Sequence, residues 1–159
     1  MENIKQHCED RMYTDSLYFD VQQTAKYCKM LGLQFFAKIE SLITSEEFVV
    51  LDVVSKTPDI CQRDLAKILL RDRANTGRLL ESLEKKELIQ RIVDVKNNRL
   101  VKRILLTEKG LKTITETREI MYPIFDKISI QFTEEELSEA KRILKKMRDI
   151  YQEIVELKI

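Results

Sequence analysis

Apolar residues recur at alternating steps of four and three along two long segments, one toward each end of the chain. In the first segment, residues 16–39, the recurring positions are Leu17, Val21, Thr24, Cys28, Leu31 and Phe35. In the second, which follows Thr133, they are Leu137, Ala140, Leu144, Met147, Tyr151 and Ile154. An α-helix turns once every ~3.6 residues, so each set lies on one face of a helix. The spacing therefore predicts two long amphipathic helices.

Three shorter helices are predicted between the long ones. The first opens at Thr44-Ser45-Glu46-Glu47, a capping-box pattern, and ends before Pro58. The second covers residues 59–70, and the third covers 73–86 with Asp72 as its cap. The inward-facing residues are expected to be Phe48, Leu51 and Val54, then Leu65, Ile68 and Leu69, then Leu79, Leu80 and Leu83. The second and third helices, joined by a tight turn, make a helix-turn-helix unit.

The pattern changes after this unit. Residues 88–95 are rich in β-forming types, 96–99 are polar and turn-prone, and 100–106 alternate imperfectly between apolar and polar. Two such runs around a short turn predict a β-hairpin. Thr107 is expected to cap a further helix that extends to about Ile130, with an interruption near Pro123. The fold class is thus mainly α with a small β-hairpin: a winged helix-turn-helix with long N- and C-terminal helices.

Length and composition fit one domain. The chain has 159 residues, 43% of them apolar, which is enough for a core. We expect residues 44–107 to form the winged helix-turn-helix, and 1–43 and 108–159 to be mainly dimerisation helices. No apolar run is long enough to cross a membrane, and the N-terminus lacks the apolar stretch of a secretion signal. With three widely spaced cysteines and no disulfide framework, a cytoplasmic location is expected.

Charge is unevenly distributed. Residues 60–110 contain 13 Lys/Arg against seven Asp/Glu, a local net charge of +6, although the whole chain carries only +1. A basic middle between acidic flanks suggests a surface that faces phosphates, and the alternative is a solvated charged face.

The predicted elements place polar side chains where a nucleic-acid interface needs them. A helix fits the major groove of B-DNA, and a two-stranded wing can reach the adjacent minor groove. Arginine suits a guanine edge, and asparagine suits adenine. The candidate DNA-binding residues are Gln62, Arg63 and Lys67 on the first helix of the unit, Arg73, Asn75, Thr76 and Arg78 on the recognition helix, and Lys96, Asn98, Arg99, Lys102 and Arg103 on the wing. Gly77 either permits a close approach to DNA or is simply tolerated.

Other chemistry has little support. The only histidine, His7, offers no catalytic pair, and no metal-ligand spacing or phosphate loop is present, so neither an enzyme nor a cofactor is expected. Cys28 is expected in the core. Cys61, near a helix N-terminus and Arg63, and Cys8 are redox-sensor candidates, with incidental cysteines as the alternative. The aromatic residues that could line an effector pocket or simply belong to the core are Tyr13, Tyr18, Phe35, Phe36 and Phe48.

The apolar stripes of the terminal helices are too long for a small winged-helix core to cover. A symmetric contact with a second copy would bury them. The residues expected at this contact are Leu17, Val21, Leu144, Met147, Tyr151, Ile154, Val155 and Leu157.

The sequence resembles the MarR family of winged-helix regulators. The similar segments are CQRDLAKIL, DRANTGRLLESLEKKELI, the LLTEKG that follows the wing, and FTEEELSEAKRIL at the last helix. The resemblance implies an obligate dimer on a pseudo-palindromic operator, released in many members by a small molecule or by cysteine oxidation. Three positions depart from the family pattern: Asn97-Asn98-Arg99 lacks the wing-tip aspartate, Glu87 stands where glycine is common, and Cys61 replaces a capping Thr or Ser.

These observations predict a homodimeric regulator of transcription that binds specific double-stranded DNA sequences and acts as a repressor. Its release by a small-molecule or redox signal is a further expectation. The alternative is a winged-helix module that binds proteins and has lost DNA binding.

Overall fold

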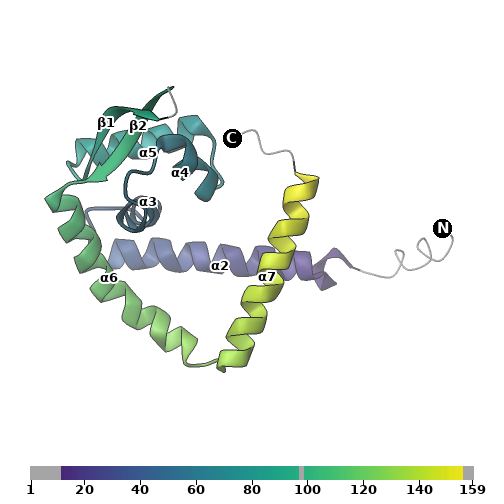
Figure 1. Ribbon diagram of the computed structural model, residues 1–159. Coiled ribbons are helices and arrows are strands. Elements are labelled where there is room, and N and C mark those ends of the chain that lie inside the picture. The colour runs from purple at the N-terminus through teal and green to yellow at the C-terminus, as the bar shows by residue number, and fades with distance from the viewer. Residues whose placement is uncertain (1–11, 97–98, 156–159) are drawn as a thin grey trace. The chain divides into compact units, whose positions relative to one another are not determined.

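The structure, a computed structural model, describes residues 12–96 and 99–155 (Figure 1). Its contacts divide the chain into two compact units, Met1–Ser45 and Glu46–Ile159. The elements in chain order are η1 (Tyr13–Asp15), α2 (Leu17–Lys38), α3 (Ser45–Lys56), α4 (Gln62–Ile68), α5 (Arg73–Lys85), β1 (Ile89–Lys96), β2 (Arg99–Leu106), α6 (Glu108–Ser129) and α7 (Glu134–Ile154). The predicted order of helices and hairpin is confirmed.

The first unit consists of η1 and the long helix α2. Ser16 caps α2 by accepting a hydrogen bond from the backbone N–H of Phe19 at 3.2 Å. Within α2 only Phe36 is buried. The expectation that Cys28 belongs to the core is wrong for the chain by itself, because Cys28 is exposed. The apolar stripe that suggested burial is mostly left uncovered.

The second unit contains the winged helix. Leu51 of α3, Leu65 of α4, Leu80 and Leu83 of α5, and Ile104 of β2 are fully buried and form its centre. α4 begins at Gln62, three residues later than predicted, because Asp59 adopts a left-handed backbone conformation (φ 61°) before it. The predicted inward position of Ile68 is wrong: its side chain is 54% exposed.

The hairpin is antiparallel and without a bulge in its described register, which runs from Ile89 opposite Leu106 to Lys96 opposite Arg99. β2 is also tied to the segment before α4. The Ile104 N–H donates to the Ile60 carbonyl at 3.0 Å, and Cys61 bridges Arg103. The wing is therefore anchored at its base to the helix-turn-helix unit.

Helix starts follow the local sequence closely. Asp72, Thr107 and Thr133 cap α5, α6 and α7 through their side chains, as predicted, and Thr133 forms a full capping box with Glu136. The expected interruption near Pro123 is wrong, because α6 continues through it to Ser129. A proline removes one backbone hydrogen bond, and the neighbouring turns of a long helix can bridge that loss.

The last two helices differ in how much they bury. α6 buries Gly110, Ile114, Thr117 and Met121, whereas α7 buries none of its residues. The apolar stripe predicted on α7 is thus left largely uncovered by the chain itself. None of the described helices is long and apolar enough to span a membrane.

Candidate nucleic-acid interface

The N-terminal turns of α5 present three exposed polar side chains: Arg73, Asn75 and Arg78. Asp72 orders them from the cap position. It accepts hydrogen bonds from the backbone N–H of Asn75 at 2.8 Å and from its side-chain amide at 2.5 Å. Asn75 Oδ1 in turn accepts from Arg78 at 3.4 Å. The bond from the Asn75 backbone, followed by that from its side chain, lowers the pKa of Asp72 and keeps the cap ionised.

Thr76, on the same helix, does not belong to the DNA-binding residues among which the sequence placed it. Its side chain is fully buried, and its hydroxyl donates to the Asp72 carbonyl at 2.9 Å. It therefore cannot contact DNA. Thr76, Leu80 and Leu83 are spaced by four and three, so they share the inward face of α5. That spacing was visible in the sequence and would have placed Thr76 in the core.

α4 contributes side chains of two kinds. Arg63 and Lys67 are exposed and available to phosphates. Gln62 is instead used within the protein, because its amide donates to the Arg73 carbonyl at 3.3 Å and joins the starts of α4 and α5. A Cβ atom on Gly77 would lie 3.4 Å from the same amide, an ordinary contact. Neither the packing nor the backbone of α5 therefore requires glycine at that position.

The wing presents its cations unequally. Lys102 is exposed, whereas Arg103 is half-buried and forms ion pairs with Asp59 (3.3 Å) and with Asp94. Arg103 thus links both hairpin strands to the loop before α4. Lys96 and Arg99 are placed by the backbone register alone, at the end of the hairpin, and Asn98 lies outside the described residues.

Two acidic residues that the sequence did not single out for this role hold α5 in place. Glu47 of α3 is 2% exposed, and its carboxylate accepts from Ser82 at 2.6 Å and from Lys86 at 2.6 and 2.8 Å. Glu84 pairs with Arg91 of β1, and the hydrogen bond from Arg91 holds the pKa of Glu84 below its ordinary value. These contacts join α5 to the helix before the unit and to the wing.

The other candidate sites are placed as follows. The Cys61 thiol donates to Asp64 at 3.1 Å, so its hydrogen-bond partner is a carboxylate rather than the cation that the redox hypothesis assumed. Cys8 and His7 lie outside the described residues. Of the five aromatic residues, Phe36 and Phe48 are buried, whereas Tyr13 and Tyr18 are exposed. Within residues 12–96 and 99–155, no group of three His, Cys, Asp or Glu residues could hold a metal ion.

The residues expected at a dimer contact are mostly exposed in the chain alone. The exposed members are Leu17, Leu144, Tyr151, Ile154 and Val155. Val21 and Met147 are half-buried, and Leu157 lies outside the described residues.

Comparison with known proteins agrees with this architecture. Residues 43–101 match the model of the MarR family. No curated protein matches the chain. Among solved structures, a Staphylococcus aureus MepR–DNA complex is similar at 27% identity and a TM-score of 0.75, covering 88% of this chain and 99% of that one.

Two more distant structures share the fold. A MarR protein from Peptoclostridium difficile has a TM-score of 0.75 at 19% identity, over 90% of this chain and 93% of its own. Apo MarR from Escherichia coli has a TM-score of 0.65 at 20% identity, over 83% of this chain and 96% of its own. With its hairpin wing, its capped α5 and the matched segment 43–101, the chain has the winged helix-turn-helix fold and is similar to regulators of the MarR family.

Proposed function

We propose that this chain is a transcriptional regulator that binds duplex DNA through α4, α5 and the wing. The observation that carries the proposal is the exposed face of α5, where Arg73, Asn75 and Arg78 project beside a core-facing Thr76. Arginine and asparagine at the start of a helix match the base edges of the major groove. The similarity to MepR, which was solved as a DNA complex, supports this assignment.

The remaining cationic side chains have different roles at the DNA surface. Arg63 and Lys67 contact phosphates and orient the helix-turn-helix unit. Lys102 and the strand ends at Lys96 and Arg99 bring the wing to the neighbouring minor groove, where a narrow groove attracts cations. Arg103 acts differently: it holds the wing to Asp59 and Asp94 rather than contacting DNA.

The DNA-binding form is a homodimer. The support is the α7 stripe, which includes Leu144, Tyr151 and Ile154 and is not covered by the chain. A two-fold axis would present two recognition helices about 34–36 Å apart, one turn of DNA, and would select a pseudo-palindromic operator. Bound there, the dimer blocks transcription.

A salt titration tests the DNA-binding proposal against the alternative of a protein-interaction module. Phosphate contacts release counterions, so the logarithm of DNA affinity should fall steeply with the logarithm of salt concentration. Lys102→Ala should make this slope shallower by about one unit, whereas Lys146→Ala, an exposed lysine of α7 outside the proposed DNA surface, should leave the slope unchanged. An affinity without salt dependence would favour the protein-interaction module.

Sedimentation tests the dimer. Leu144→Glu places a charge on the uncovered stripe of α7 and should shift the chain toward the monomer. Lys146→Glu, on the opposite face of the same helix, is the matched control and should leave the dimer intact. Equal behaviour of the two variants would contradict an interface on this stripe.

A further inference from the structure

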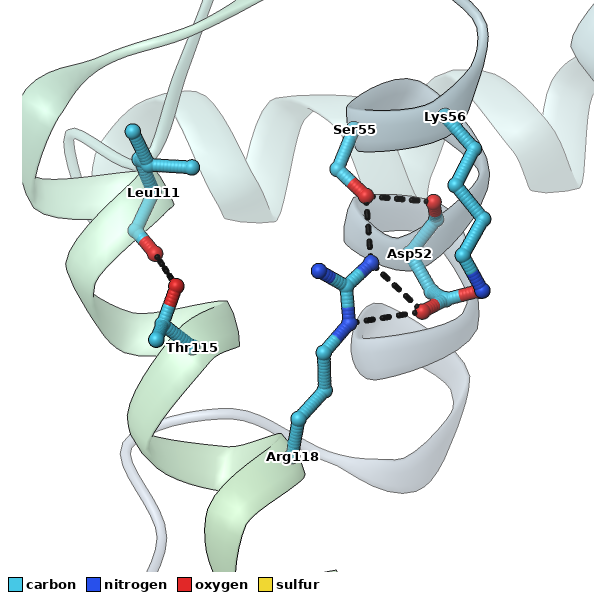
Figure 2. A network of polar contacts seen from close by, with 6 residues as sticks. All are labelled: Asp52, Ser55, Lys56, Leu111, Thr115 and Arg118. Atoms are coloured by element: carbon cyan, nitrogen blue, oxygen red, sulfur yellow. Dashed lines mark hydrogen bonds and ion pairs between the residues drawn. The ribbon is translucent and has the colours of Figure 1, made fainter. Parts of the chain in front are cut away.

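α6 connects the wing to the last helix, and it is attached to the winged helix at two separated points. Near its start, Gly110 packs against the backbone at Leu88. Two turns later, Arg118 reaches across to α3 (Figure 2). The buried apolar residues Ile114 and Met121 add contact, but the hydrophobic effect that drives their burial is not directional.

Arg118 makes a fixed, directional contact. Its Nε and one Nη donate to Asp52 Oδ1 at 3.0 and 2.7 Å, and the same Nη donates to Ser55 Oγ at 2.5 Å. Lys56 occupies the other oxygen of Asp52, at 2.8 Å. A planar guanidinium bound along one edge resists rotation as well as translation, which a single ammonium does not.

The contact is also partly shielded from water. The side chains of Arg118 and Asp52 are 22% and 23% exposed. Burial raises the pKa of Asp52, but hydrogen bonds from Lys56 and Arg118 outweigh it and leave that pKa below its ordinary value. The carboxylate therefore stays ionised at neutral pH, and the clamp persists.

We propose that the Arg118–Asp52 clamp fixes the tilt of α6 against the winged helix and thereby sets the half-site spacing that the dimer accepts. This inference rests on the proposed function. Ser129, at the end of α6, lies 19 residues beyond Gly110, which is about 28 Å along the helix. A tilt of about 10° around Gly110 would move that end by about 5 Å, more than the ~3.4 Å rise of one base pair. In a dimer held through the helices beyond this point, such a tilt changes the distance between recognition helices.

Arg118 is thus a positioning residue. Its loss should change which half-site spacing the protein prefers, and not the affinity for every duplex alike. The test measures binding of the purified full chain to its selected duplex and to duplexes with one base pair inserted or removed between the half-sites. The unmodified chain should bind the altered duplexes roughly tenfold more weakly. With Arg118→Met this preference should fall to about threefold or less, and Arg118→Lys should lie between the two.

Two variants complete the design. Arg142→Met removes an exposed ion pair with Glu139 on α7 and should keep the full spacing preference. Asp52→Asn is isosteric, so it tests the clamp if Arg118→Met fails to fold. Weaker binding by one common factor at every spacing would show that the clamp only stabilises the fold, and would overturn the proposal. Failure of the unmodified chain to bind any duplex would instead refute the proposed function.

Discussion

Gly110 lies directly against the backbone of Leu88. It belongs to the first turn of α6, which begins at Glu108. A Cβ atom built on Gly110 would lie 1.9 Å from the Leu88 carbonyl oxygen and 2.9 Å from its carbonyl carbon. The Thr107 N–H donates to that same oxygen at 3.1 Å, so the carbonyl cannot easily move away. This approach explains physically why the LLTEKG segment ends in glycine: no larger residue fits between α6 and the start of the hairpin.

Replacing Gly110 should therefore destabilise the fold. We expect Gly110→Ala to lower the free energy of unfolding by about 3 kcal/mol, because backbone must shift to admit the methyl group. Gly32→Ala is the control, since its Cβ would lie 3.6 Å from Ser45 and the change should stabilise α2 by up to ~1 kcal/mol. Urea denaturation of both variants checks the contrast, and equal midpoints would contradict it.

At Glu87, in contrast, substitution by glycine should stabilise the fold. Its backbone is left-handed (φ 60°), a conformation that disfavours residues with a Cβ atom. Glu87→Gly should raise the unfolding free energy by about 0.5–1 kcal/mol, despite losing the exposed ion pair with Lys109. Glu87→Ala loses the same ion pair without relieving the backbone and should not stabilise. Thermal melts compare the two variants, and a glycine variant that melts at or below the alanine variant would contradict backbone strain at Glu87.

Two adjacent glutamates of α3 allow a buried ion pair to be compared with an exposed one. Glu47→Ala leaves Lys86 and Ser82 without their carboxylate and should destabilise by about 2 kcal/mol or more. Glu46→Ala removes an exposed pair with Arg71 at 2.6 Å and should change stability by less than about 1 kcal/mol. Denaturation in urea compares them at one pH. A similar decrease in unfolding free energy in both variants would show that the burial of Glu47 does not strengthen its ion pair.

Asp52 should make stability depend on acid pH. Because its folded-state pKa lies below the ordinary value of 3.8, the unfolded chain takes up its proton first as pH falls. The stability that ionised Asp52 supplies is fully present above 3.8 and is lost as pH falls through the lower folded-state pKa. Denaturation midpoints measured from neutral pH to about pH 2.5 should show Asp52→Asn less stable than the parent only at the higher pH values. A gap between them that stays constant across this range would refute the assignment.

Local sequence was enough to predict most of the fold. Asp72, Thr107 and Thr133 cap helices because a short polar side chain can reach a backbone N–H two or three residues ahead. Both partners of this interaction lie close together in the sequence, so the sequence alone can predict it. The hairpin followed equally from a change of period around a polar turn. Helix and strand identity depended little on distant contacts in this chain.

Contacts between distant residues could not be predicted in the same way. Glu47 meets Lys86 39 residues away, and Asp52 meets Arg118 66 residues away. The sequence shows such residues only as charges on a helix, with nothing to say which opposite charge faces them. Arg103 illustrates the consequence: the sequence places it at the DNA surface as one more cation of the wing, whereas in the structure it pairs with Asp59 and Asp94.

The recognition helix is tested most directly by sequencing duplexes that the purified chain selects from a random pool. We expect enrichment of a pseudo-palindrome whose half-site centres lie about 10–10.5 base pairs apart. Arg73→Ala or Arg78→Ala should relax the preference at particular bases by about 1–3 kcal/mol each, without abolishing selection elsewhere in the site. A selected pool no different from its input, or variants that select the same sequences as the parent, would contradict base reading by the exposed face of α5.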